Sequence, residues 1–421
     1  MESSSVNISS IGKLSWKDAT AKKILLKLLS KMEHGSITLQ EDDQTHQFGD
    51  PNSDLKAHVT INDPKFYWSM LTGGTIAAGE CYFNGFWDSP DVTKVIRVLA
   101  RNLTLIDTID HRFSGISQLV QRFSHFANRN SKSQSKKNIV AHYDLGNDFY
   151  KLFLDETMMY SSAVFTTPND SLYQAQIQKL DDICQRVQLK PGDKVIEIGT
   201  GWGGFAVHAA KNYGVHVTTT TISDEQHKYA EEQIRKEGLQ SQITLLKEDY
   251  RNLEGKYDKL VSIEMIEAVG HQFLPTFFKT CNDLLKPNGK MLIQAITIAD
   301  QRYDRYRKQA DFIQKYIFPG GFLPSVQVMN QKIAKHTDLK VSSLHDIGLD
   351  YALTLKHWSD RLKAARGDLS KLGLDQSFYR MWQFYFYYCE GGFRERLIST
   401  VHLTAEKPRY VDPDHALIQN S

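Results

Sequence analysis

The chain has 421 residues, of which 41% are hydrophobic and 24% are charged, and its formal net charge is only +2. This length suits two or three domains with well-formed cores. The near-neutral balance excludes a protein that binds polyanions over its whole surface, so nucleic acid is not expected as a partner. The sequence has four widely spaced cysteines without grouped histidines, so we predict neither a disulfide framework nor a metal site.

The first residues lack a basic segment followed by an apolar core, and no apolar run approaches the ~18 residues that would span a bilayer. These features favour a cytoplasmic protein that is soluble or attached to a membrane surface.

The first part of the chain, residues 1–127, is predicted to form a small α+β domain. Residues 14–32 place leucine and isoleucine at helical spacing between lysines, which predicts an amphipathic helix with a basic face. Its apolar side suits either a protein core or a membrane surface. Residues 58–61 are strand-like, and we expect the glycines around them to form turns. These glycines are Gly73, Gly74, Gly79 and Gly85.

A polar run rich in serine and lysine covers residues 128–140 and predicts a linker. From residue 141 to 421, short apolar strands alternate with amphipathic helices, which predicts a doubly wound α/β domain. We expect strands at 194–198, 215–221, 242–246, 258–263 and 290–296, and helices at 203–213, 224–237 and 272–285. Residues 297–335 interrupt the alternation with many aromatic side chains, so we expect an inserted segment that covers the substrate.

The segment from Lys194 to Ala210 is typical of a strand, a glycine-rich turn and the start of a helix. Gly199 and Gly201 would let the backbone approach a ligand. Glu197 would repel a phosphate but would pair with a cationic ligand such as S-adenosylmethionine. A tight turn without a ligand is the alternative. The second strand ends in threonines and not in an acidic residue, which disfavours NAD.

Eight motifs of the chain occur in the order found in the cyclopropane fatty acid synthases, and the sequence resembles that family. The motifs are HYDLGNDFY (142–150), MMYSSAVF (158–165), VIEIGTGWGG (195–204), TISDEQ (221–226), EDYRNL (248–253), SIEMIEAVG (262–270), FIQKYIFPGGFLPS (312–325) and CEGGFRER (389–396). The resemblance implies a Rossmann-like class I methyltransferase domain. It also implies transfer of a carbon from S-adenosylmethionine to the cis double bond of an unsaturated acyl chain in a phospholipid.

The resemblance further implies that the N-terminal domain engages lipid and that the enzyme is attached peripherally to the inner face of the membrane. It suggests a homodimer, which no residue pattern of the sequence establishes. Carried over position by position, the family's cofactor-binding residues, together with Glu197, are Tyr160, Ser161, Gly199, Gly201, Thr221, Gln226, Asp249 and Tyr250.

In the family, a bicarbonate ion takes up the proton that the methylated chain loses. The positions that would hold this ion are Ser162, Glu267, Gln294 and Tyr351. Ser162 stands where the family has cysteine, and Gln294 stands where it has histidine. A glutamine carries no positive charge and relays no proton, so anion binding should be weaker.

This departure leaves three outcomes open. A cyclopropane forms with bicarbonate still bound, or the product is a methyl- or methylene-branched chain, or the protein binds lipid and cofactor without turnover. The intermediate cation needs aromatic faces near it. Residues 378–388 and the aromatics between 303 and 318 are the candidates, although most are expected to form core or the wall of an acyl tunnel.

Overall fold

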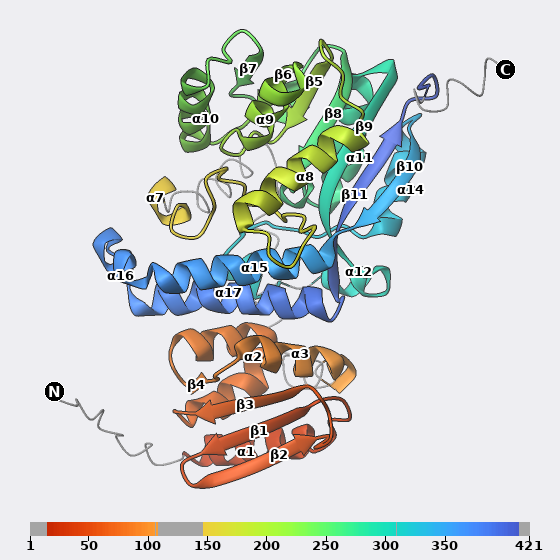
Figure 1. The fold of residues 1–421 in the computed structure, drawn as a ribbon. Coiled ribbons are helices and arrows are strands. Elements are labelled where there is room, and N and C mark those ends of the chain that lie inside the picture. The colour runs from red at the N-terminus through yellow and green to blue at the C-terminus, as the bar shows by residue number, and fades with distance from the viewer. Residues whose placement is uncertain (1–14, 106, 108–145, 309, 412–421) are drawn as a thin grey trace. The chain divides into compact units, whose positions relative to one another are not determined.

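The computed structural model describes residues 15–105, 107, 146–308 and 310–411. The expected linker at 128–140 lies outside these residues. The chain divides into two compact units, one formed by residues 1–121 and 373–395, the other by 122–372 and 396–421 (Figure 1). The first unit therefore includes a helix from near the end of the sequence.

The first unit is a four-stranded sheet with helices packed on it. The strand order is β2-β1-β3-β4, with β1 parallel to β3 and antiparallel to β2. Its elements are α1 (Trp16–Leu29), β1 (Ser36–Glu41), β2 (Gln44–Gly49), β3 (Lys56–Ile61), α2 (Lys65–Phe83), β4 (Trp87–Asp88), α3 (Val92–Arg101) and α17 (Gln376–Arg394).

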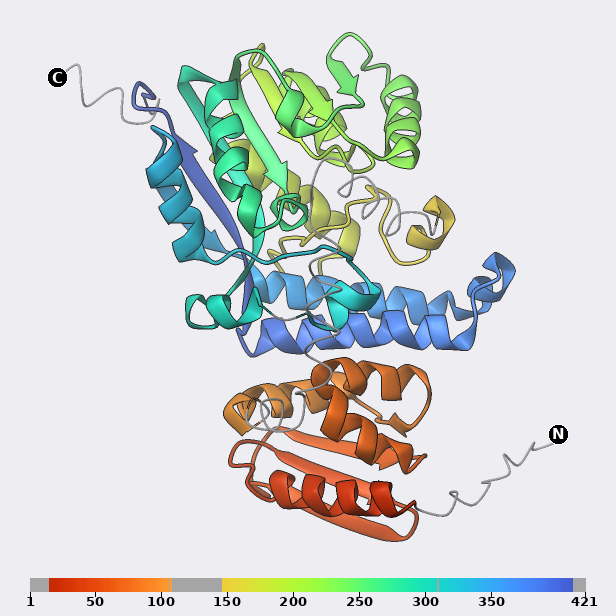
Figure 2. The ribbon, with the colours of Figure 1, turned by 180° about the vertical axis from the view of Figure 1, so that it is seen from behind.

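Helix α1 starts at Ser15, whose hydroxyl accepts a hydrogen bond from the amide of Asp18, and lies across the sheet (Figure 2). Leu25, Leu28 and Leu29 are buried, so the apolar side of the helix packs in the core of this unit. Of the two environments that the sequence left open for that side, the structure shows the protein core.

Helix α17 carries the long aromatic run of the sequence. Phe384 lies 5.6 Å from Tyr82 between ring centroids, and Arg380 is 4.0 Å from the centre of the Tyr82 ring. Glu395, which caps the C-terminal end of α17, forms ion pairs with Arg97 and Arg101 of α3. Much of this aromatic helix thus contributes to the core of the first unit.

The second unit contains a seven-stranded sheet in the order β10-β11-β9-β8-β5-β6-β7. The five strands from β9 to β7 run parallel, and β11 is antiparallel to both of its neighbours. The strands are β5 (Lys194–Ile198), β6 (His216–Thr220), β7 (Ile243–Leu246), β8 (Tyr257–Ile263), β9 (Leu285–Ile298), β10 (Lys340–Asp346) and β11 (Ile398–Glu406). This is the predicted doubly wound α/β architecture.

Helices cover both faces of this sheet, as the two views show (Figures 1 and 2). On one face α8, α9 and α10 bury residues such as Val195 and Leu292, and on the other α11 and α14 bury Ile196 and Ile293. The helices are α7 (Asn147–Tyr150), α8 (Leu172–Arg186), α9 (Gly204–Tyr213), α10 (Asp224–Lys236), α11 (Leu274–Leu284), α12 (Asp300–Tyr306), α13 (Phe312–Tyr316), α14 (Val326–His336), α15 (Gly348–Ala364) and α16 (Arg366–Leu369).

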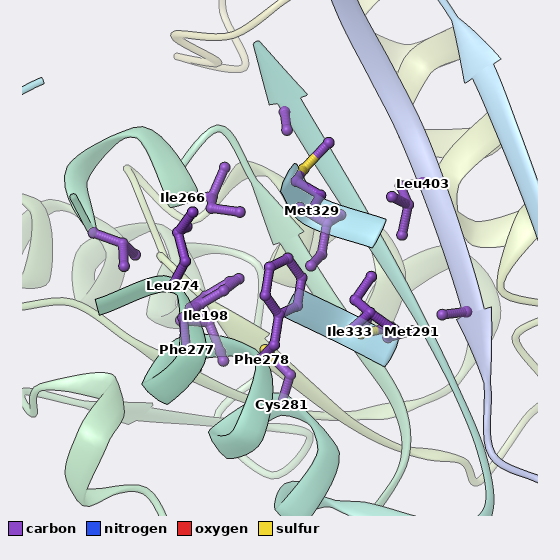
Figure 3. Close-up of a cluster of buried hydrophobic side chains, with 14 of the residues drawn as sticks. Ile198, Ile266, Leu274, Phe277, Phe278, Cys281, Met291, Met329, Ile333 and Leu403 are labelled. Carbon is purple, nitrogen blue, oxygen red and sulfur yellow. The ribbon is translucent and has the colours of Figure 1, made fainter. Parts of the chain in front are cut away.

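Figure 3 shows the core between the sheet and the pair α11 and α14, with Phe278, Met329 and Leu403 facing one another. The neighbouring residues along each strand point to the opposite face, because side chains alternate in a strand. This alternation places Glu197, Gln294 and His402 on the α8 face, among buried groups.

Three of the glycines expected to form turns lie inside a helix instead. Gly73, Gly74 and Gly79 belong to α2, which has a kink at Gly74, where φ is 55°. The flanking residues are apolar enough to keep the helix packed on both sides of the kink, since Tyr67 and Leu71 before it and Ile76 and Cys81 after it are buried. Gly85, just after the helix, adopts a φ of 78° and does form a turn.

Within the described parts of the chain, none of the helices combines the length and the apolar character that crossing a bilayer requires.

Candidate active site

The glycine-rich turn after β5 leaves room beside its backbone. Gly199, Gly201 and Gly203 all adopt positive φ values, of 104°, 53° and 94°. A Cβ atom added at Gly201 would meet nothing within 4 Å, whereas one at Gly199 would lie 3.1 Å from the Cβ of Met265. The turn is therefore closed on the side of β8 and open at Gly201, and α9 begins directly after it.

Glu197, one strand residue before the turn, is 2% exposed and accepts a hydrogen bond of 2.6 Å from the hydroxyl of Thr219. Burial raises the pKa of Glu197 to about 8, with Thr219 and the ammonium of Lys179 acting in the opposite direction. Lys179 of α8 is itself buried, which lowers its pKa to about 8, and its Nζ donates to the hydroxyl of Ser161 at 2.8 Å. The carboxyl of Glu197 thus stays near a buried cation in the absence of ligand.

The ends of β6 and β7 carry the next group of predicted residues. Thr221 donates to the side-chain oxygen of Gln226 at 2.9 Å, so the NH₂ group of Gln226 points away from Thr221. Asp249 accepts two hydrogen bonds from the guanidinium of Arg251, of 2.7 and 2.5 Å, and a third from its backbone N–H at 3.0 Å. Tyr250, which follows Asp249, packs its ring edge-on against Phe277 at 5.6 Å. The parallel strands bring these side chains to the same edge of the sheet as the glycine turn.

Aromatic rings from three segments gather around Tyr160. The ring centroids of Trp358 and Phe318 lie 5.2 and 5.9 Å from that of Tyr160, and Phe318 stacks on it. Trp358 also meets Tyr351 edge-on at 5.9 Å. Phe318 belongs to the segment 297–335, so this part of the expected insertion lies against a predicted cofactor residue.

A carboxylate that the sequence analysis did not select lies at the centre of the predicted anion site. Glu264 directly follows β8, and its Oε1 accepts from the backbone N–H of Ser162 at 2.9 Å and from Nε2 of Gln294 at 2.7 Å. Its Oε2 accepts from the hydroxyl of Tyr351 at 2.9 Å. Three of the four positions expected to hold bicarbonate therefore donate to Glu264.

The backbone of Glu264 is held in the left-handed region, with φ of 48°. This conformation costs a non-glycine residue about 1 kcal/mol or more. Its own N–H donates to the carbonyl of Gln294 on the neighbouring strand at 2.8 Å. Strand pairing and the three side-chain contacts together fix the direction of the carboxylate.

A series of hydrogen-bonded side chains orients the amide of Gln294. His402 of β11 pairs in register with Gln294, and its Nε2 lies 3.0 Å from Oε1 of Gln294. Its Nδ1 lies 3.0 Å from Asp182 of α8. Burial lowers the pKa of His402, and Asp182 acts against that shift. With its oxygen turned toward His402, Gln294 presents its NH₂ group to Glu264.

The second carboxyl, Glu267, has a different environment. Its Oε1 accepts from the backbone N–H of Ile296 at 2.6 Å, and among the described residues its buried Oε2 meets no hydrogen-bond partner. Desolvation, followed by the nearby charge of Glu264, raises the pKa of Glu267 well above its usual range. Desolvation also raises the pKa of Glu264, but its three donors and Lys179 oppose this shift. Of the two carboxyl groups, Glu264 thus has the surroundings that better stabilise a negative charge.

The structure thus brings Ser162, Gln294 and Tyr351 together, with Glu267 beside them. Ser162 contributes its backbone N–H, because its hydroxyl donates to the carbonyl of Ala163 at 3.0 Å. Sequence reasoning missed Glu264, Lys179 and His402. The signal for Glu264 was present, since the SIEMIEAVG motif holds two glutamates three residues apart after a strand.

A family model described as mycolic acid cyclopropane synthetase matches residues 130–403. This chain belongs to that family. Its relatives include tuberculostearic acid methyltransferase UfaA1 of Mycobacterium tuberculosis (strain ATCC 25618 / H37Rv), which is 37% identical over 79% of this chain and 78% of the relative. They also include cyclopropane-fatty-acyl-phospholipid synthase of Escherichia coli (strain K12), which is 36% identical over 83% of this chain and 87% of the relative.

A crystal structure of mycolic acid cyclopropane synthase CmaA1 with SAH and CTAB superposes with a TM-score of 0.61 and 30% identity, covering 65% of this chain and 98% of that one. The class I methyltransferase fold is thereby confirmed. The protein is a methyltransferase of the mycolic acid cyclopropane synthetase family, and S-adenosylmethionine is its cofactor.

Proposed function

We propose that this methyltransferase transfers a one-carbon unit from S-adenosylmethionine to the cis double bond of an unsaturated acyl chain in a phospholipid. The proposal rests on the carboxylate of Glu264, which accepts three hydrogen bonds and lies beside a group of aromatic rings. Such a combination suits a reaction that passes through a carbon cation and ends with the loss of a proton.

The predicted cofactor residues fit S-adenosylmethionine. Gly201 borders open space, and the backbone N–H groups at the start of α9 suit the carboxylate of the cofactor. Glu197 suits its ammonium, Gln226 suits the ribose hydroxyls, and Asp249 suits the adenine amino group. When bound, the cofactor supplies a methyl group on a sulfonium, which an alkene attacks only if the two are held in close alignment.

Once the methyl group has moved, the residues around the double bond must stabilise the carbocation and must not form a covalent bond to it. The ring of Tyr160, which is partly exposed and packs on the buried Trp358, would attract the cationic charge on the chain without forming a bond to it. No cysteine stands at position 162, and the hydroxyl of Ser162 is engaged with Ala163, so this side chain does not trap the cation. A nearby base then completes the reaction.

Two products are compatible with this site. The cation closes to a cyclopropane when the added methyl group loses a proton and bonds to the second chain carbon. After a hydride shift between the two chain carbons, loss of a proton from the same methyl group instead gives a methylene branch. The departures at Ser162 and Gln294 favour the branched chain as a second candidate, and relatives named for both chemistries match this chain at 36 and 37% identity.

Attachment to a membrane surface would give the enzyme access to its lipid. Helix α1 exposes Lys23 and Lys27, with Lys31 just after it, and Trp16 is 76% exposed at its start. Lysines on one face attract anionic lipid headgroups, and tryptophan suits the interface.

The substrate is tested with S-adenosylmethionine labelled in its methyl carbon and a matched panel of lipids. Phospholipid vesicles with cis-monounsaturated, trans-monounsaturated and saturated chains are compared with the free cis-unsaturated acid. We expect label in the acyl chain of the cis phospholipid and none in the saturated one. Label found only in the free acid, or only in a headgroup, would contradict the proposal. Proton NMR of the product separates upfield ring protons from vinyl methylene protons.

A further inference from the structure

The groups that would bind bicarbonate are already engaged. A bicarbonate ion in this site would need the donors of Ser162, Gln294 and Tyr351, and all three donate to the carboxylate of Glu264 at 2.7–2.9 Å. A second anion at the same donors would lie against the charge of Glu264 and beside Glu267. The described site therefore does not fit bicarbonate.

We propose that Glu264 is the catalytic base of this enzyme and takes the place of bicarbonate. A carboxylate presents the same planar pair of charged oxygens as bicarbonate and lacks only the hydroxyl group of that ion. This inference rests on the proposed function, because it concerns the proton that the methylated acyl chain loses.

The strained backbone of Glu264 supports a role beyond stability. A φ of 48° is unfavourable for glutamate, and strained residues of this kind concentrate at functional sites. The left-handed turn directs the side chain from the end of β8 toward Tyr351, whose ring contacts Trp358 of the aromatic group. The carboxylate thus lies next to the rings that would surround the cation.

The proton transfer balances without any other reactant. A C–H bond of the added methyl group breaks, and its electron pair forms either the third side of the ring or the new double bond. The proton moves to an oxygen of Glu264, which becomes a neutral carboxylic acid. After the product departs, water that enters the site takes the proton from Glu264 and restores the carboxylate.

The surrounding residues orient the carboxylate of Glu264 for this step. Gln294 supplies a donor without positive charge, and His402 holds its amide in the required orientation. A histidine at position 294 would form an ion pair with Glu264 and would weaken it as a base. The uncharged donor at position 294 and the carboxylate at position 264 therefore suit one another.

The experiment compares Glu264→Gly, Glu264→Gln and the exposed control Glu254→Gln with the wild-type enzyme. Glycine adopts the positive φ easily and leaves the anion site empty. Glutamine occupies the same space as Glu264 but cannot act as a base. Binding of ¹³C-labelled bicarbonate is followed by NMR, and methyl transfer is measured in buffer depleted of carbon dioxide and again with added bicarbonate. S-adenosylmethionine binding by calorimetry confirms that each variant is folded.

We expect wild-type turnover without bicarbonate, unchanged on its addition, and no bound ion. Both Glu264 variants should lose roughly 100-fold or more in turnover, the usual range for a general base. Bicarbonate should bind to Glu264→Gly and raise its turnover about tenfold, but it should neither bind to Glu264→Gln nor raise its turnover.

Bicarbonate binding to the wild type, or full activity of Glu264→Gln, would overturn the inference. If the wild type labels no acyl chain, the proposed function fails, while the binding comparison still tests whether Glu264 fills the anion site.

Discussion

Two glutamates of the same motif, three residues apart, have different electrostatic surroundings. Glu264 has three donors and a nearby lysine, whereas Glu267 has one donor and a neighbouring negative charge. Environments that separate two carboxyl groups in this way commonly assign them different roles.

Replacing Glu267 by glutamine should reduce methyl transfer by less than about tenfold. Glutamine resembles the protonated carboxyl, and its side-chain oxygen still accepts from the N–H of Ile296. Initial rates with labelled cofactor test this expectation, with Glu264→Gln as the comparison. Equal losses in the two variants would show that Glu267 acts as an ionised group.

Glu197 predicts a pH dependence of stability in the cofactor-free protein. Its folded pKa of about 8 lies above the unfolded value, so the folded state holds a proton that the unfolded state releases. The stabilisation is complete below the unfolded pKa of about 4.5 and is lost as the pH rises toward 8, with a slope on the order of 1 kcal/mol per pH unit.

Urea unfolding of the wild type and of Glu197→Gln at pH 5 to 8 measures this effect. The free energy of unfolding of the wild type should fall relative to the variant over that interval. Parallel curves for the two proteins would mean that Glu197 is ionised in the folded state.

At the scale of elements, two glycines flank helix α9, and replacing each by alanine distinguishes an effect on stability from an effect on cofactor binding. Gly201→Ala should lower stability by about 1 kcal/mol and weaken S-adenosylmethionine binding at least tenfold, because the new Cβ enters the open side of the turn. Calorimetric titration with the cofactor measures the affinity.

The matched control is Gly214→Ala at the other end of α9. Gly214 has a φ of 64°, and its added Cβ would lie 3.6 Å from Pro191, an ordinary contact. It should cost similar stability and leave cofactor affinity unchanged. If both variants lost affinity equally, the effect of Gly201 would be one of folding and not of contact.

The five parallel strands could be predicted because each is a short apolar run that ends at a turn signal. β10 and β11 were missed, since β10 is largely exposed and lacks a buried face to reveal its period. The predicted anion-site positions Ser162, Gln294 and Tyr351 were brought together by the fold. His402 could not be foreseen, because its role depends on the register that pairs it with Gln294 across more than a hundred residues of chain.

At the scale of the whole molecule, the proposed function requires the enzyme to reach an acyl chain that is embedded in a bilayer. The exposed lysines of α1 predict binding to vesicles with anionic lipid that weakens as salt is raised. Changing Lys23, Lys27 and Lys31 together to glutamate should reduce sedimentation with such vesicles by about tenfold. The apolar face of α1 is engaged in the protein core, so binding should depend mainly on charge.

The control changes Lys228, Arg235 and Lys236 to glutamate on α10, where the residues are also exposed. The net charge falls by the same amount, but vesicle binding should persist. Equal loss in both triple variants would argue for a general charge effect, and salt-insensitive binding would argue against the lysines of α1.

The most direct test of the central claim uses S-adenosylmethionine with a trideuterated methyl group and cis-unsaturated phospholipid vesicles in buffer free of bicarbonate. The released acyl chains are analysed by mass spectrometry and NMR. We expect a chain with one added carbon that retains two of its three deuterium atoms, because the added methyl group gives one to Glu264. Retention of all three, or label in the chain only when bicarbonate is present, would contradict it.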